Sequence, residues 1–188
     1  MTMDNPVQML THEHKYILKV VHALAAIDAD LGRGDHVDPG LLTRVVDFMR
    51  HFADKCHHAK EEAVLFPAMQ TKGVPKTGCP LSALLAEHAK GRELVAALEE
   101  GTRDYASGES SGVAQIRAAI GGIRQLYPNH IWKEDEMVFP MAERLFSTDE
   151  LTQLKAAFDA AETEFGHGHD AYVAFANDME RLLDREHV

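Results

Sequence analysis

Histidine and glutamate recur in this chain at a spacing that can hold metal ions. His57 and Glu61 lie four residues apart, and so do His130 and Glu134. On a helix, side chains four residues apart share one face, with their Cβ atoms roughly 5–6 Å apart. Each pair can therefore direct an imidazole nitrogen and a carboxylate oxygen at one point, which is a chelating arrangement for a cation.

The two pairs belong to an internal duplication. Residues 57–67 and 130–140 align without gaps and share His, Lys, Glu, Phe and Pro, and an acidic residue follows the Glu in both copies. A Glu-His dipeptide lies upstream of each copy, its His 43 residues before the first His of one copy and 42 before that of the other. The duplicated unit thus offers six candidate metal ligands: His14, His57, Glu61, His88, His130 and Glu134.

The sequence predicts that the segments carrying these residues are helices. Asn5-Pro6, Asp38-Pro39 and Cys79-Pro80 each place proline at the first position of a helix, and residues 147–150 form a capping box. Glycine-rich loops separate the segments, and no strand pattern is present. We expect helices near residues 6–31, 39–71, 80–106, 113–145 and 148–185, the last broken around Gly166-His167-Gly168.

The candidate ligands occupy positions within apolar stripes. In the predicted fourth helix the stripe runs through Ile116, Ile120, Ile123, Tyr127, His130, Glu134, Met137 and Met141. In the second it is less clean and runs through His57, Glu61, Val64 and Ala68. A buried carboxylate without a partner is costly. Bound cations would offset that cost, and a four-helix bundle with short connections brings four such stripes to one axis.

Composition limits the class of protein. The 188 residues can bury a core without disulfides, and a formal net charge of −11 argues against nucleic acid and anionic membranes as partners. We find neither a secretory signal nor a long apolar run, and the two cysteines form no CxxC motif. We predict a cytoplasmic, all-α protein, a monomer or homodimer. An up-down-up-down four-helix bundle spans residues 1–146, and a C-terminal helical extension packs on it over 147–188.

The ligand types indicate the metal. Nitrogen and oxygen ligands without thiolate suit iron or manganese, and zinc less specifically. Structural zinc sites are usually tetrahedral and rich in cysteine, and ferritin-like sites require Glu-x-x-His pairs that these stripes lack. The two-fold repeat suggests two ions. Each would take two His and one oxygen from each of two bridging Glu, with an oxo or hydroxo bridge and one open position.

From about Leu10 to about Leu145 the chain resembles the hemerythrin-like, HHE cation-binding domains. The motifs that carry the resemblance are Glu13-His14, residues 57–67, Cys79-Pro80-Leu81 leading to Glu87-His88, and residues 130–140. The resemblance implies a non-haem di-iron centre with two Fe ions per chain, held by the six candidate ligands. It also implies a small diatomic or oxidant ligand, namely O2, NO or peroxide.

One position departs from the oxygen carriers of this family. The hemerythrins of marine worms use five His, one Glu and one Asp, whereas here Arg92 stands four residues after His88 in place of a second His. The departure favours sensing, oxidant or NO chemistry, or iron handling over oxygen carriage, and our first hypothesis is a sensor or scavenger. The alternatives are a di-iron oxidoreductase that consumes peroxide or nitric oxide, an iron-handling or iron-centre repair protein, and an iron-responsive element loosened by metal loss.

Residues around the ligands receive simpler interpretations. His58 and Glu62 offer a rival register for the first pair, but the Phe-Pro that follows at the same distance in both copies favours His57 and Glu61. We expect His58 to be partly exposed or to act only indirectly on the ligands, and Lys60 and Lys133 to be solvated.

We further expect a helix kink or end at Pro67 and Pro140, because proline removes a backbone hydrogen bond. Several other side chains are expected to pack in the core or to be solvated, rather than to react. The core residues are Cys56, Phe66, Tyr127, Met137, Phe139 and Met141. The segment His167-Gly168-His169-Asp170 forms a solvated break in the last helix. At Cys79, the position at a helix start offers a lowered thiol pKa as an alternative.

Overall fold

The computed structural model describes residues 5–78, 80–165 and 168–183, and these residues form helices joined by short connections. The first and third helices of the bundle are α1 (Pro6–Arg33) and α4 (Leu81–Ala106). The second runs as α2 (Pro39–Phe48), η1 (Met49–His58), η2 (Glu61–Leu65) and α3 (Phe66–Thr71). The fourth runs as α5 (Gly112–Lys133), η3 (Glu134–Val138) and α6 (Phe139–Leu145).

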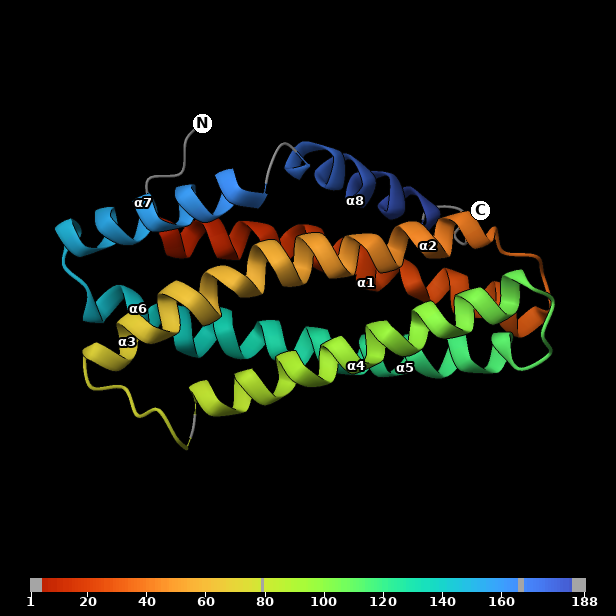
Figure 1. The fold of residues 1–188 in the computed structure, drawn as a ribbon, viewed down its shortest axis with the longest axis horizontal. Helices are drawn as coiled ribbons and strands as arrows, with labels where there is room; N and C mark the ends of the chain where they lie inside the picture. Colours follow the sequence, from red (N-terminus) through yellow and green to blue (C-terminus); the bar gives the residue numbers. More distant parts are fainter. Residues whose placement is uncertain (1–4, 79, 166–167, 184–188) are drawn as a thin grey trace.

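Figure 1 shows these four helices running back and forth along one long axis, with α7 (Thr148–Phe165) and α8 (His169–Leu183) along one side. The predicted all-α four-helix bundle with a C-terminal helical extension is confirmed. The division into residues 1–146 and 147–188 stays a prediction. No helix within the described residues is long and apolar enough to cross a membrane.

Local signals set the helix ends. The side chain of Asn5 accepts a hydrogen bond from the backbone N–H of Val7 at 2.9 Å, and that of Asp38 accepts one from Gly40 at 3.0 Å. The capping box also forms, since the N–H of Ser147 donates to Glu150 at 2.9 Å. The expectations for Cys79 and His167 fall outside the described residues.

Pro67 and Pro140 do not end their helices. The backbone N–H of the preceding residue bonds five residues back, to the carbonyl of Glu61 in one copy and of Glu134 in the other. This is the hydrogen bond of a π-helix, which inserts one extra residue into a turn. Proline lacks an N–H and crowds the carbonyl four residues before it. The wider turn just before each proline accommodates it, so the helix continues as α3 and α6.

The π-helical turns also change which residues face inward. Beyond Glu134 the buried position is Val138, whereas Met137 is 49% exposed. Beyond Glu61 the buried position is Leu65 rather than Val64. The expectation that Met137 packs in the core was therefore wrong, because one extra residue in the turn rotates every later side chain.

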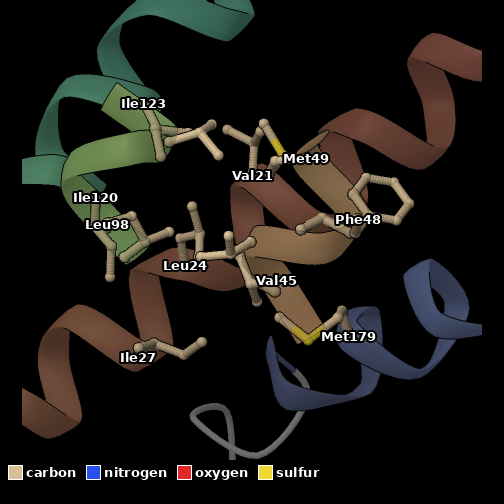
Figure 2. Packing of buried hydrophobic residues seen from close by; sticks show 14 of the residues in the cluster. Val21, Leu24, Ile27, Val45, Phe48, Met49, Leu98, Ile120, Ile123 and Met179 are labelled. Atoms are coloured by element: carbon tan, nitrogen blue, oxygen red, sulfur yellow. The ribbon is translucent and has the colours of Figure 1, made fainter. Parts of the chain in front are cut away.

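Two apolar clusters lie on either side of His14 along α1. One contains Val7 and Leu10, and the other contains Ile17, Val20 and further residues. Figure 2 shows part of the second cluster, where residues of α1, α2, η1, α4 and α5 meet Met179 of α8: Val21, Leu24, Ile27, Val45, Phe48, Met49, Leu98, Ile120 and Ile123. The polar centre of the bundle is thus enclosed by packed apolar side chains.

The C-terminal extension contributes to both clusters. Phe158 of α7 is fully buried in the cluster around Leu10. Phe175 and Met179 of α8 are buried in the cluster around Val21. Each fully buried side chain of this size stabilises a fold by roughly 1.5–3 kcal/mol. The extension is therefore an integral part of the core.

Candidate metal centre

All six predicted ligands converge in the middle of the bundle. These residues are at most 3% exposed, although they come from α1, α4, α5 and three π-helical segments. Glu61 and Glu134 each begin one of the π-helical turns. The π-helices therefore lie at the centre itself, as such turns often do at functional sites.

The two imidazoles of the first half come from the first and second helices of the bundle. The Nε2 atoms of His14 and His57 lie 2.9 Å apart. Nε2 of His14 lies 3.2 Å from Glu134 Oε2, and Nε2 of His57 lies 3.7 Å from Glu61 Oε1. One ligand atom from each of these four residues falls within 4.8 Å of the others.

The second half repeats this geometry. The Nε2 atoms of His88 and His130 lie 3.1 Å apart. Oε1 of Glu134 lies 3.2 Å from Nε2 of His130 and 3.6 Å from that of His88. Oε2 of Glu61 lies 3.5 Å from Nε2 of His88. Each Glu thus presents one oxygen to each half, which is the arrangement of a bridging carboxylate.

The two carboxylates show that the site fits cations. All four oxygens of Glu61 and Glu134 are buried and accept no hydrogen bond from any described residue. Buried carboxylate oxygens are normally satisfied, and leaving them without a partner is expensive. Positive charge between the two Glu would satisfy all four.

The pKa values of Glu61 and His14 reflect the same demand for positive charge. Burial and the neighbouring Glu134 raise the pKa of Glu61 well above its usual value. Burial alone would lower the pKa of His14, but the neighbouring carboxylates of Asp135 and Glu134 raise it to about 9. A proton on these residues supplies the positive charge that a bound cation would otherwise supply. Metal binding therefore releases such protons from the ligands.

An outer set of carboxylates orients every imidazole. Nδ1 of His57 lies 2.8 Å from Glu13, and Nδ1 of His130 lies 3.0 Å from Glu87. The other two contacts join His14 to Asp135 at 2.9 Å and His88 to Glu62 at 2.7 Å. These contacts hold Nε2 of each ring toward the centre. Such partners fix the ring and increase its basicity as a ligand.

This outer set was not among the residues predicted from the sequence, although the repeat contained its signal. Glu13 and Glu87 are the acids of the two Glu-His dipeptides, and Glu62 and Asp135 are the acids that follow Glu61 and Glu134. Their roles depend on which helices face each other, which the spacing within one helix does not define.

One lysine in each copy contacts a carboxylate of the outer set, but the two lysines differ in burial. Lys60 contacts Glu13 and lies 2.8 Å from Glu162 on α7, whereas Lys133 contacts Glu87 at the corresponding place in the second copy. Lys60 is fully buried, and Lys133 is 38% exposed. The expectation that Lys60 is solvated was wrong, because α7 covers the first copy.

His58 is likewise buried, so of its two expected places, partly exposed or beside the ligands, only the second agrees with the structure. Its ring stacks on that of His88 with centroids 3.8 Å apart, and Nδ1 lies 3.3 Å from Asp54. Burial lowers the pKa of His58 to about 3, which keeps the imidazole neutral. Ligand atoms of His58, His88 and His130 fall within 4.8 Å of one another. A third imidazole is therefore available to the second half.

The remaining neighbours behave as packing residues. Phe139 stacks on His14 with centroids 5.4 Å apart, and Phe66 stacks on His88 at 6.1 Å. Cys56 is buried, and burial raises the pKa of its thiol to about 12. A thiol so difficult to ionise is a poor nucleophile, so Cys56 is a small core residue as expected.

Fold and centre together define a cation-binding helical bundle. Comparison with family models agrees: residues 5–142 match the hemerythrin HHE cation binding domain. The match covers most of the chain, which therefore belongs to this family. Searches of curated proteins and of solved structures found no match.

Proposed function

We propose that this chain is a non-haem di-iron protein that binds or senses O2, NO or peroxide. The observation that carries the proposal is the pair of buried carboxylates, Glu61 and Glu134, whose four oxygens accept no hydrogen bond from the described residues. Each faces one imidazole pair with one oxygen and the second pair with the other. Two bridging Glu and four His give each of two irons a nitrogen and oxygen ligand set, as Fe prefers.

The iron would supply a redox-active centre with an open position for a small ligand. The chain's own residues would hold this centre in place. Glu13, Glu62, Glu87 and Asp135 fix the imidazole rings, while the flanking apolar clusters exclude bulk water. An apolar shell of this kind controls solvent access and redox potential.

We also propose that His58 acts as a third imidazole for the ion held by His88 and His130. Its ligand atom lies near theirs. Arg92 occupies the position where oxygen-carrying relatives have a further His, and it bonds instead to Asp54 at 2.8 Å. His58 can therefore replace the missing nitrogen from a different helix.

Elemental analysis and visible spectroscopy test the proposed function. Protein purified with iron supplied should contain two irons per chain and should form a visible band with O2 that disappears when O2 is removed. Sustained loss of peroxide or NO in proportion to iron content would instead assign an oxidoreductase. Protein that never holds more than one iron would overturn the di-iron proposal. The cytoplasmic location and the oligomeric state stay predictions.

A further inference from the structure

A cavity of about 370 Å³ lies beside the second half of the centre. This volume is at the lower end of the range for small-molecule sites. It is roughly ten times the share of one water molecule in the liquid, so it exceeds what O2 or NO needs. Met49, Asp54, Lys55, His58, Arg92 and Tyr127 are among its lining residues.

Tyr127 adds a polar group to the lining of this cavity. Its side chain is only 3% exposed, yet its hydroxyl makes no hydrogen bond to any described residue. The hydroxyl lies over Gly91, where a Cβ atom would be 3.0 Å away. The hydroxyl is not among the fully buried polar atoms that lack a partner, so it is accessible from the cavity that Tyr127 lines. Its donor is therefore available to an acceptor bound there.

The charged groups of the cavity favour an anion. Lys55 is exposed and has no acidic partner among the described residues, its nearest contact being His51 at 3.4 Å. Arg92 uses Nε and Nη2 for Asp54 and Glu62, which leaves Nη1 of its five-donor guanidinium to a further acceptor. Two cations with unused donors are notable in a chain whose net charge is −11.

The rest of the lining is apolar. Met49 and Val95 are 1% and 3% exposed and form one wall together with the ring of Tyr127. An apolar wall combined with a few converging donors is typical of a site for an organic molecule. The ring of His58 separates this cavity from His88.

We propose that this cavity binds a small organic anion, such as a carboxylate with a short apolar body. The anionic head accepts hydrogen bonds from Tyr127 and Arg92 and is attracted by Lys55, while the body lies against Met49 and Val95. The organic anion lies next to the metal centre without replacing any of the protein ligands proposed there. The proposal concerns a site separate from that of the diatomic or oxidant ligand.

Calorimetric titration of the iron-loaded protein with benzoate tests the proposal, with benzyl alcohol as the neutral counterpart. We expect benzoate to bind with a Kd of about millimolar order and benzyl alcohol to bind more weakly. Tyr127→Phe should weaken benzoate binding roughly tenfold, because it removes a hydrogen bond to a charged group. Lys55→Gln should weaken it by up to about fivefold.

Lys15→Gln is the matched control. Lys15 is also exposed and lines a different cavity, of about 330 Å³, next to Asp135 and Phe139. Its loss should leave benzoate affinity unchanged. The proposal is overturned by a lack of saturable benzoate binding, by equal affinities in the wild type and Tyr127→Phe, or by equal effects of the two lysine variants. It is also overturned if benzoate shifts the visible band of the iron, since that would place it on the metal. Iron content, measured separately, tests the di-iron proposal independently.

Discussion

The ammonium nitrogen of Lys60 lies 2.8 Å from Oε1 of Glu162, which links the second helix of the bundle to α7. Lys60 also contacts Glu13, whose other oxygen lies 2.8 Å from Nδ1 of His57. A chain of polar contacts thus leads from the C-terminal extension to His57, one of the candidate metal ligands. The second copy ends at Lys133, which is partly open to solvent. The duplicated unit is therefore symmetric at its centre and asymmetric at its periphery.

This asymmetry predicts unequal effects of one substitution in the two copies. Lys60→Met leaves the buried Glu13 without its ammonium partner, and breaking a buried pair costs about 3–5 kcal/mol. Lys133→Met removes a partly exposed partner, for which about 0–1 kcal/mol is usual. Urea unfolding of the metal-loaded variants measures both values. Equal losses of unfolding free energy would contradict the role assigned to α7.

The outer carboxylates should affect metal affinity without binding metal. Glu87→Ala removes the partner of Nδ1 of His130, and we expect roughly 10–100-fold weaker binding of one ion. Competition with a chelator measures the affinity. Glu93→Ala is the control, because Glu93 is exposed and its ion pair is with Lys90 on the same helix. If both variants hold iron equally well, the ring of His130 is oriented by other means.

His58 should contribute to one of the two ions. His58→Phe preserves a ring that can stack on His88 but removes the nitrogen atoms. We expect metal affinity at the second position to fall while the first ion is retained, so partly depleted protein should hold one iron. His51→Phe, on the same π-helix and about one-third exposed, should hold two. Full retention of both irons by His58→Phe would show that His58 is only a packing neighbour.

We expect substitution by alanine to have opposite effects on fold stability at Gly101 and at Gly121. A Cβ atom on Gly101 would lie 2.9 Å from the backbone nitrogen of Ile116, where α4 and α5 cross closely. Gly101→Ala should therefore destabilise the fold by about 1–3 kcal/mol. A Cβ atom on Gly121, also inside a helix, would meet no described neighbour within 4 Å beyond its own helix, and Gly121→Ala should stabilise the fold by up to about 1 kcal/mol. Thermal unfolding distinguishes the two signs.

The start of α7 should depend on pH. Hydrogen bonds from Lys72 and Ser147 lower the pKa of Glu150 to about 2 from a usual 4.5. A lowered folded-state pKa gives a contribution that is complete above the unfolded value and is lost as pH falls through the folded one. We therefore expect this cap to weaken only between about pH 4.5 and 2. An NMR titration measures the pKa directly, and Lys72→Met should raise it. An unchanged pKa in that variant would contradict the ion pair.

The sequence alone determined the fold class and brought the six candidate ligands to attention. The spacing of His57 with Glu61 and of His130 with Glu134 is a property of one helix, and the caps at Asn5 and Asp38 depend on neighbouring residues. Local rules of this kind can be read without knowing which helices meet. Their duplication then indicated a shared centre.

The tertiary structure alone decided what surrounds those ligands. The π-helical turns moved the buried position from Met137 to Val138, because a period of 3.6 residues does not anticipate an inserted residue. Lys60 is buried only because α7, which carries Glu162, covers it. Nδ1 of His14 contacts Asp135, which lies 121 residues later in the chain on another helix. Burial and pairing between helices depend on which surfaces meet, and sequence spacing does not contain that information.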